Sequence, residues 1–348
     1  MRESGLLLNT LMRITLVTDT YTPSVNGVVT TLVNTVAELQ KLGHEVQVIE
    51  PSQFKTVPTP GYKEIRLAWN IWRVGPMIEA FNPHAIHIAT EGPLGFAARW
   101  YCKVDKRSIP HNTSYHTKFP EYFNKFFKFP TDWGYWFIKM FHKFSTRVLV
   151  TNETMRRELT DRGFEHLAVW NRGVDTDIFN PQRREISGVK KPIILCVSRA
   201  SYEKGLDDFC SLQIDGTKIL VGDGPYLPEL KRKYPYINYA GYKSGVELAE
   251  YYACADVFVF PSKTDTFGVV MLEAMACGTP IAAYPVTGPS DIVVNGINGY
   301  MHDNLETAVK YALVCDRKKV HESSKEYTWS GCTAAFVENL SLIKSVDN

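Results

Sequence analysis

The chain alternates between short apolar runs of strand length and longer segments of helical periodicity, and this alternation constrains its fold more than any other feature. The run 13–18 leads into a loop, a helix predicted over 28–42 and a strand predicted over 45–50, with Gly43 as the helix C-cap. A strand, a helix and a strand within about 35 residues form the unit of a parallel sheet. Further elements are predicted as strands over 85–89 and 147–151 and a helix over 153–162.

The same alternation restarts after residues 181–191, which have the polar composition of a linker. The later elements are predicted as strands over 193–197, 218–221, 257–260 and 280–283 and a helix over 269–276. Two such series predict an α/β protein with two Rossmann-like domains facing each other across a deep cleft, where open parallel sheets bind ligands. We expect domains over 1–187 and 188–328, with a helix in 329–348 packing back on the first domain.

The composition is that of a globular protein, with 45% apolar and 22% charged residues in a chain of 348. Residues 1–190 hold 24 basic against 18 acidic residues and the remainder 15 against 19, so the first half is expected to meet an anionic surface or substrate. The seven cysteines are scattered and form no C-x-x-C pair, which indicates a reducing cytoplasm and neither a disulfide frame nor a zinc site. Cys196 and Cys254 lie in apolar runs and are expected in the core. No apolar run approaches the ~18–20 residues that span a bilayer.

The segment 260–278 carries the strongest signal for a binding site. It begins as a strand end, continues as a polar loop and becomes a helix that Gly278 closes. Free backbone N–H groups at such a helix N-terminus stabilise an anion. Glu273 lies in the apolar part of the helix, where a carboxylate needs polar partners such as ribose hydroxyls; partial exposure or a bond to a neighbouring loop is the alternative. The candidate ligands of a phosphorylated sugar are Asp265, Phe267, Gly268, Val269, Val270 and Glu273.

Asp265-x7-Glu273, followed by Ala-Met-Ala-x-Gly278-x-Pro, resembles the signature of the family-4 retaining glycosyltransferases, which have the GT-B fold. The resemblance implies a hexosyltransferase that uses a UDP- or GDP-linked sugar and needs no cofactor. The family usually has Glu at the first position. Asp265 therefore leaves the identity of the hexose open.

The segment 197–205 is similar to the family's Gly-Arg-x3-Glu-Lys-Gly element, with Ser198 in place of the first glycine. The resemblance implies that Arg199 and Lys204 offset the charge of the leaving diphosphate; as lone residues they could also be solvated surface charges. No D-x-D motif stands at a strand end, so these cations and the helix N-terminus are expected to act without a metal. The motif 219–225 is expected to be structural, because its glycines permit tight turns. Tyr242 is expected either at the nucleobase or in packing.

In the first half, residues 19–27 resemble the loop that closes over the donor phosphate in this family, and Gly27 is the residue carried over. His116, in Ser-Tyr-His-Thr, matches the histidine near the transferred sugar, and with Asp265 it is expected to position the sugar. Asp19 and Tyr21 are expected on the acceptor side. Arg172, in the motif 170–175, is expected near the acceptor or the phosphates. In the family, the leaving phosphate is thought to help deprotonate the acceptor on the same face.

Residues 118–147 hold twelve aromatic residues and six basic against two acidic ones. An apolar stripe with helical spacing, flanked by Lys139 and Lys143, is typical of a helix that lies in an anionic membrane interface. The alternative is the core face of an ordinary helix. Nucleic acid could use the same mixture, but the donor motifs argue against it. The stripe consists of Trp133, Trp136, Phe137, Met140, Phe141 and Phe144, and Lys125 and Lys128 precede it.

Three segments, 87–95, 114–122 and 169–175, are most similar to enzymes that glycosylate diacylglycerol, namely glucosyl/glucuronosyl and sulfoquinovosyl diacylglycerol synthases, and to related α-mannosyltransferases. We therefore expect hexose transfer to a membrane lipid by a protein peripheral to the cytoplasmic membrane face. Transfer from GDP-mannose to a lipid-linked or polysaccharide acceptor is the alternative. From another class, a non-catalytic sugar-nucleotide-binding protein remains open. An epimerase or dehydrogenase is disfavoured because residues 18–27 lack a G-x-G-x-x-G motif.

Overall fold

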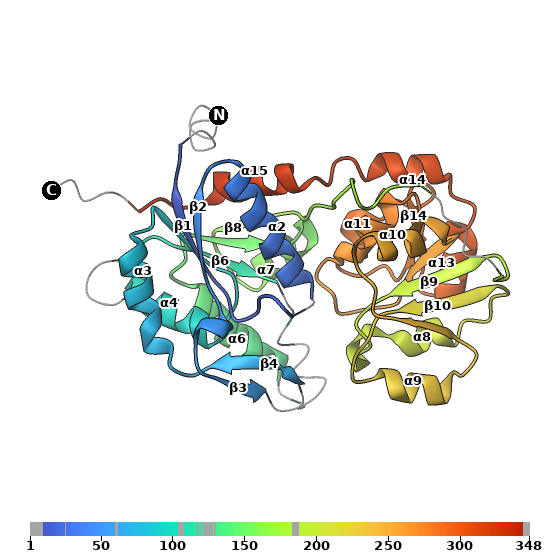
Figure 1. Ribbon diagram of the computed structural model, residues 1–348, viewed down its shortest axis with the longest axis horizontal. Helices are drawn as coiled ribbons and strands as arrows, with labels where there is room; N and C mark the ends of the chain where they lie inside the picture. The colour runs from blue at the N-terminus through green and yellow to red at the C-terminus, as the bar shows by residue number, and fades with distance from the viewer. Residues whose placement is uncertain are drawn as a thin grey trace. The chain divides into compact units, whose positions relative to one another are not determined.

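The computed structural model describes residues 10–24, 26–59, 62–103, 108–116, 118, 120, 128, 130–182 and 188–343 (Figure 1). The chain divides into two compact units, one of residues 1–171 with 329–348 and one of residues 172–328. This division falls earlier in the chain than the expected boundary at residue 187. The physical reason is that Val174 and Phe179 are buried in the core of the second unit.

The first unit contains a sheet of six parallel strands in the order β2-β1-β5-β6-β7-β8. Its strands are β1 (Arg13–Val17), β2 (Glu45–Ile49), β5 (Ala85–Ile88), β6 (Asn112–Tyr115), β7 (Arg147–Val150) and β8 (Leu167–Val169). The chain runs outward from β1 to β2 and then crosses to β5 on the other side of β1. The carboxyl ends of β1 and β5 therefore form the switch point of this sheet, which is where such sheets place ligands.

Helices cover both faces of this sheet (Figure 1). They are α2 (Gly27–Lys41), α3 (Val74–Phe81), α4 (Pro93–Lys103), α6 (Thr131–His142), α7 (Glu153–Asp161) and α15 (Trp329–Asn339). Ile14 and Leu16 pack with α2 and α15, whereas the alternate residue Val17 packs with α3 and α4. Gly43 ends the turn after α2 with φ +89°, as the sequence predicts.

A short antiparallel hairpin, β3 (Thr56–Thr59) and β4 (Tyr62–Ala68), and two 3₁₀ turns, η1 (Pro51–Gln53) and η2 (Ile71–Arg73), were not predicted from the sequence. The C-terminal helix α15 belongs to the core of the first unit. The ring of its Phe336 lies 4.9 Å from the rings of both His87 and Trp170.

The second unit contains six parallel strands in the order β11-β10-β9-β12-β13-β14. They are β9 (Ile193–Val197), β10 (Thr217–Val221), β11 (Asn238–Gly241), β12 (Val257–Phe260), β13 (Ile281–Ala283) and β14 (Gly299–Met301). Numbered within the unit, this is the 3-2-1-4-5-6 order of dinucleotide-binding sheets. Its switch point lies between the carboxyl ends of β9 and β12.

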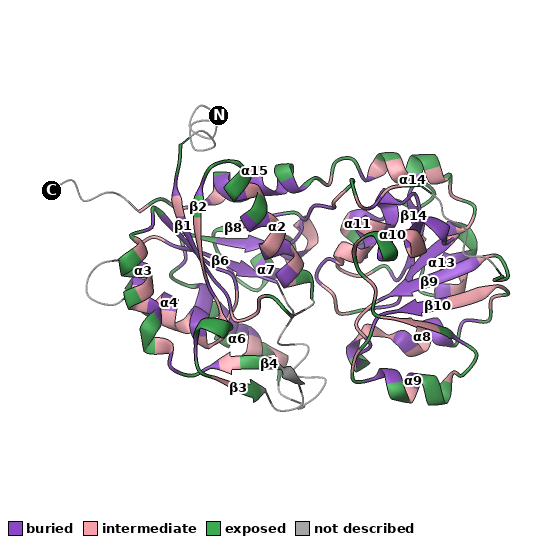
Figure 2. Ribbon diagram, in the orientation of Figure 1, coloured by how far each residue is buried: buried purple, intermediate pink, exposed green. Residues whose placement is uncertain are grey.

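The second sheet is also covered on both faces, and its strands are mostly buried (Figure 2). Its helical elements are η3 (Tyr202–Lys204), α8 (Leu206–Cys210), α9 (Leu227–Lys233), α10 (Gly245–Cys254), α11 (Val269–Ala276), α12 (Pro289–Ile292), α13 (Leu305–Ala312) and α14 (Arg317–Ser323). Helices α10, α11 and α14 pack on one face and α8, α9 and α13 on the other. Cys196 and Cys254 are buried, as expected.

Candidate active site

The switch point of the second sheet brings together charged residues from two separate loops. Lys204 follows β9, and its Nζ lies 2.5 Å from Oδ1 of Asp265, which follows β12. The two side chains keep 21% and 18% of their surface exposed, so a ligand can still reach them. Arg199 also follows β9. The loop after β9 therefore carries two cations, one of which pairs with Asp265, at the place where a nucleotide sugar is expected.

Gly205 explains how Lys204 reaches Asp265. Its φ is +65°, and a Cβ at this position would lie 2.5 Å from the carbonyl oxygen of Pro261. Because only glycine fits both constraints, the turn η3 can press directly against the chain that leaves β12.

Glu203 is a buried carboxylate beneath Arg199, and sequence reasoning gave it no role. Its side chain is 2% exposed, its Oε1 accepts a hydrogen bond from Ser201 Oγ at 2.5 Å, and Arg199 Nη2 lies 3.5 Å from the same oxygen. A buried carboxylate is costly unless a cation or donors satisfy it, so this contact favours one placement of Arg199. The signal in the sequence was an acidic residue four positions after an arginine.

The loop after β10 packs directly against the loop that carries Arg199. Cβ atoms at Gly222 and Gly224 would lie 1.9 Å and 2.4 Å from the carbonyl oxygens of Ser198 and Ala200. The Ala200 N–H donates to the carbonyl oxygen of Asp223 at 2.9 Å. These glycines thus have the packing role that the sequence predicts for them.

Helix α11 begins beside Asp265. Gly268 is its N-cap residue with φ +98°, and no side chain caps the first turn. The preceding loop is held by close packing, since a Cβ at Gly288 would lie 2.8 Å from the carbonyl oxygen of Phe267. The N–H groups of Val269 and Val270 belong to this uncapped turn. Such a turn suits a phosphate, because its N–H groups and the helix dipole both favour negative charge.

Glu273 lies one turn further along α11 and has a partner that the sequence did not reveal. Tyr252 Oη of α10 donates a hydrogen bond to Glu273 Oε2 at 2.9 Å. Burial raises the pKa of Glu273 to about 7, against the opposing effect of this hydrogen bond. The carboxylate is therefore bonded to a neighbouring helix, not to a loop. The Glu273 carboxylate can accept further hydrogen bonds in addition to the one from Tyr252.

Tyr242 follows β11 and is 54% exposed. This exposure excludes the alternative that it packs in the core. The ring remains available to a flat ligand such as a nucleobase.

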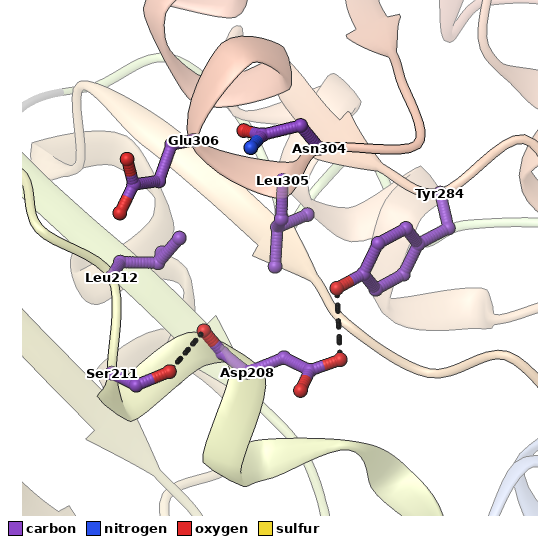
Figure 3. Close-up of a pocket in the computed structure, with 7 residues that line it drawn as sticks. All are labelled: Asp208, Ser211, Leu212, Tyr284, Asn304, Leu305 and Glu306. Carbon is purple, nitrogen blue, oxygen red and sulfur yellow. Dashed lines mark hydrogen bonds between the residues drawn. The ribbon is translucent and has the colours of Figure 1, made fainter.

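The hollow in Figure 3 lies elsewhere in the second unit and has an acidic lining. Tyr284, directly after β13, donates to Asp208 Oδ2 at 2.8 Å. The lining residues are Asp208, Ser211, Leu212, Tyr284, Asn304, Leu305 and Glu306. The carboxylates of Asp208 and Glu306 would repel a diphosphate, so this hollow is a poor candidate for the donor.

The switch point of the first sheet is organised around Asp19. Its carboxylate accepts hydrogen bonds from the Leu94 N–H at 2.8 Å, the Gly95 N–H at 3.3 Å and Thr90 Oγ1 at 2.8 Å. Burial raises the pKa of Asp19 to about 6, and these hydrogen bonds oppose the rise. Both carboxylate oxygens are thus engaged within the first unit, two of the donors being N–H groups in the first turn of α4.

Gly27 is the first residue of α2, and the Asn26 side chain caps this helix through the Val28 and Val29 N–H groups. A Cβ at Gly27 would meet nothing within 4 Å. His116 directly follows β6, is largely buried and has its ring 5.8 Å from the ring of Trp170. His116 thus lies at a strand end, whereas Gly27 lies at a helix N-terminus.

The remaining predicted residues are dispersed. Tyr21 is half-buried against the core of the first unit, and Arg172 is buried at the start of the second. Lys125 lies outside the described residues. Lys128 is exposed, with φ +55°.

Five of the six residues of the predicted stripe are exposed: Trp133, Trp136, Phe137 and Met140 on α6, and Phe144 just after it. Phe141 was assigned to this stripe wrongly, since it is buried against α4, where its ring lies 4.8 Å from that of Phe96. Tyr135, Ile138 and His142 provide the rest of the buried face. Lys139 is exposed. The alternative that the whole stripe is a core face is therefore wrong.

Family models match most of the chain. Residues 25–178 match the model described as Glycosyltransferase Family 4, and residues 191–314 match Glycosyl transferases group 1. A GDP-mannose-dependent alpha-mannosyltransferase of Corynebacterium glutamicum is 29% identical over 92% of this chain and 87% of its own. A sulfoquinovosyl transferase of Arabidopsis thaliana is 29% identical over 86% of this chain and 67% of its own. The alpha-monoglucosyldiacylglycerol synthase of Streptococcus pneumoniae is 26% identical over 87% and 78%.

Solved structures share the fold. Sucrose-phosphate synthase from Thermosynechococcus elongatus has a TM-score of 0.73 at 19% identity, covering 92% of this chain and 96% of its own. Anabaena HepE, in complex with UDP and glucose, has a TM-score of 0.68 at 17% identity, covering 91% and 95%. Two parallel α/β sheets with this topology are the GT-B fold, and the family models identify the chain as a glycosyltransferase. The chain belongs to the family-4 glycosyltransferases, as its motifs predict.

Proposed function

We propose that the protein transfers a hexose from a UDP- or GDP-linked donor to a membrane lipid such as diacylglycerol, with retention of anomeric configuration and without a metal. The observation that carries the proposal is the Lys204–Asp265 pair beside the uncapped N-terminus of α11. It offers a cation, a hydrogen-bond acceptor and free N–H groups within one switch point, which are the groups that a sugar diphosphate requires.

In this proposal the donor diphosphate lies between the side chains of Arg199 and Lys204 and the first turn of α11. Asp265 accepts a hydrogen bond from a sugar hydroxyl, and Glu273 accepts from the ribose. Tyr242 contacts the base. Gly27 and His116, of the first unit, act on the phosphate and on the transferred sugar.

The chemistry then needs no protein nucleophile. The bond between the anomeric carbon and the phosphate oxygen breaks, and the acceptor oxygen forms its bond on the same face of the sugar. The acceptor proton passes to the released phosphate. Arg199 and Lys204 stabilise the charge that develops on this leaving group, and fixed charges of this kind are often the largest contribution to catalysis.

The exposed stripe of α6 supports the lipid acceptor. The further candidates on the acceptor side are Asp19, Tyr21, Arg172, Lys125 and Lys128. Aromatic side chains interleaved with lysine suit the head-group region of an anionic membrane. Two of the relatives are named for sulfoquinovosyl transfer and for synthesis of a glucosyl diacylglycerol. We place the protein at the cytoplasmic membrane face. Within the part of the chain that the structure describes, no helix is long and apolar enough to cross a membrane.

The test is a screen of UDP- and GDP-sugars with diacylglycerol dispersed in vesicles, read by mass spectrometry. A glycosyl diacylglycerol from one donor supports the proposal. Product only from GDP-mannose with a polysaccharide or lipid-linked acceptor favours the mannosyltransferase alternative, which the corynebacterial relative supports. Donor binding with neither transfer nor hydrolysis would leave a sugar-nucleotide-binding protein.

A further inference from the structure

Five of the seven tryptophans are more than half exposed, and all five lie in the first unit. They are Trp69, Trp72, Trp100, Trp133 and Trp136, with exposed fractions between 51% and 67%. The other two, Trp170 and Trp329, are buried in the core of the same unit. Single exposed apolar side chains are ordinary, but a concentration of the largest ones on one unit marks an interaction surface.

Helix α4 joins the tryptophans of α6 to those near η2. On its side toward α6, the Phe96 ring lies 5.5 Å from that of Phe137, and Arg99 Nε donates to the Phe141 carbonyl oxygen at 2.7 Å. On its other side α4 packs on α3 and η2, where Gly75 leaves room for the Tyr101 ring. The three elements are therefore neighbours in the fold.

Trp100 lies between these two sides of α4. It is about 40° around the helix from Phe96, since each residue turns by about 100°. Beyond it, the rings of Trp69 and Trp72 meet edge to face at 5.6 Å. We call the exposed residues Trp69, Trp72, Trp100, Trp133, Trp136, Phe137, Met140 and Phe144 the aromatic surface.

The charges within the aromatic surface are almost all positive. Segments 69–73, 93–103 and 131–144, which carry this surface, hold five basic residues against one acidic residue, Asp132. The basic residues are Arg73, Arg99, Lys103, Lys139 and Lys143. Lys103 Nζ lies 3.6 Å from the centre of the Phe144 ring, and Lys55 Nζ lies 5.8 Å from that of Trp69. Cations held at the aromatic rings can meet lipid phosphates at the depth where the rings enter the head-group region.

We infer that the whole aromatic surface, and not α6 alone, docks on a bilayer that contains anionic lipid. Trp72 and Trp100 then enter the interface together with Trp133 and Trp136. This inference rests on the proposed function only in taking a membrane as the place of the acceptor. Charge complementarity selects the partner, because a neutral bilayer would leave five cations without counter-charges.

The test uses the full chain and phosphatidylcholine vesicles with and without phosphatidylglycerol. We expect binding only with phosphatidylglycerol, and a loss of about tenfold or more in partitioning for Trp72→Ala/Trp100→Ala, as for Trp133→Ala/Trp136→Ala, because each pair removes large apolar area from the interface. Brominated lipid should quench tryptophan emission in the wild type, and less so in Trp72→Ala/Trp100→Ala.

Wild-type binding by Trp72→Ala/Trp100→Ala, with loss only in the α6 variant, would overturn the inference in favour of α6 alone. Equal binding to neutral vesicles would also overturn it. Self-association that the variants lose, without vesicle binding, would show that the partner is a protein. Val314→Ser, at an exposed apolar residue of the second unit, is the control and should bind normally.

Vesicle binding and catalysis can fail separately. Transfer to detergent-dispersed diacylglycerol by Trp72→Ala/Trp100→Ala should equal that of the wild type, because neither residue belongs to the proposed site. If the vesicle results hold and no lipid is glycosylated, the proposed acceptor is wrong and the docking surface stands. If lipid is glycosylated and the vesicle results fail, only the docking surface is wrong.

Discussion

The two sheets have related topologies, yet their switch points are used in opposite ways. In the first unit, Asp19 follows a central strand and its carboxylate occupies the N-terminus of α4. In the second, Asp265 also follows a central strand, but it pairs with Lys204 and no side chain caps α11. A carboxylate of the chain occupies one helix N-terminus, whereas the other is open to the phosphate of a ligand. The same architecture thus gives one helix N-terminus filled by the chain itself and one that we propose as a binding site.

The largest effect is expected from a change at the switch point of the second sheet, where no side chain caps α11. Lys204→Ala should lower kcat/KM by about 10²–10³-fold, because it removes a cation from the leaving diphosphate. The melting temperature should change little, since the ion pair is partly exposed. Lys263→Ala is a matched control in the loop after β12, where Lys263 pairs with Asp208, and it should retain activity. Near-normal turnover by Lys204→Ala would refute the donor-site assignment.

Glu203→Gln tests the same switch point, because the buried Glu203 carboxylate pairs with Arg199 in the loop after β9. We expect kcat/KM to fall about tenfold and inhibition by free UDP or GDP to weaken, as Arg199 loses a charged partner. Ser201→Ala removes only the hydrogen bond to Glu203 and should have a smaller effect. Reduced thermal stability with unchanged kinetics would assign Glu203 a purely structural role.

Asp19→Ala tests the switch point of the first sheet, where the Asp19 carboxylate occupies the N-terminus of α4. The expected loss there is in stability. Removing the cap of α4 should lower the free energy of unfolding by about 1–2 kcal/mol, measured by urea denaturation. Burial raises the pKa of Asp19 from 3.8 to about 6, so the folded wild type keeps a proton that the unfolded chain releases. The free energy of unfolding of the wild type should therefore fall as pH rises from 3.8 to about 6. Over the same range the difference in stability between the wild type and Asp19→Ala should shrink. If the variant keeps its stability but no longer uses the acceptor, Asp19 acts on the acceptor and not as a cap.

The smallest effect concerns the pH dependence of donor binding. Burial raises the pKa of Glu273 to about 7, and the ionised carboxylate is the stronger acceptor for the ribose hydroxyls. The KM for the donor should therefore fall a few-fold as pH rises through neutrality. Glu273→Gln should flatten this profile. A profile that Glu273→Gln leaves unchanged would show that another group is responsible.

Much of the fold could be predicted from local patterns. The bounds predicted for β9, β12 and α11 agree with the structure, because fully buried strands and a glycine-bounded helix have strong local signals. The hairpin β3–β4 was missed. Its strands are short, one contains Pro58, and their pairing with each other depends on contacts that no local period reveals.

The site could be predicted in part. Motif resemblance gave roles to Arg199, Lys204, Asp265 and Glu273. It gave none to Glu203, although this residue stands in the same motif, and it did not include Tyr252; the part that both play comes from burial beside a charged neighbour. On α6 the sequence showed an apolar stripe but not which of its residues are buried. Packing against Phe96 decided that Phe141 lies inside while Trp133 and Trp136 remain outside.

The sequence alone determined the two strand–helix series, the family and the residue types of the donor site, because these depend on short-range spacing. The tertiary structure decided which helix N-terminus is filled and which is open. Lys204 and Asp265 are 61 positions apart, and Asp19 and Leu94 are 75 apart. Such pairs meet only when crossover connections set neighbouring strands side by side, and that arrangement is a property of the folded sheet.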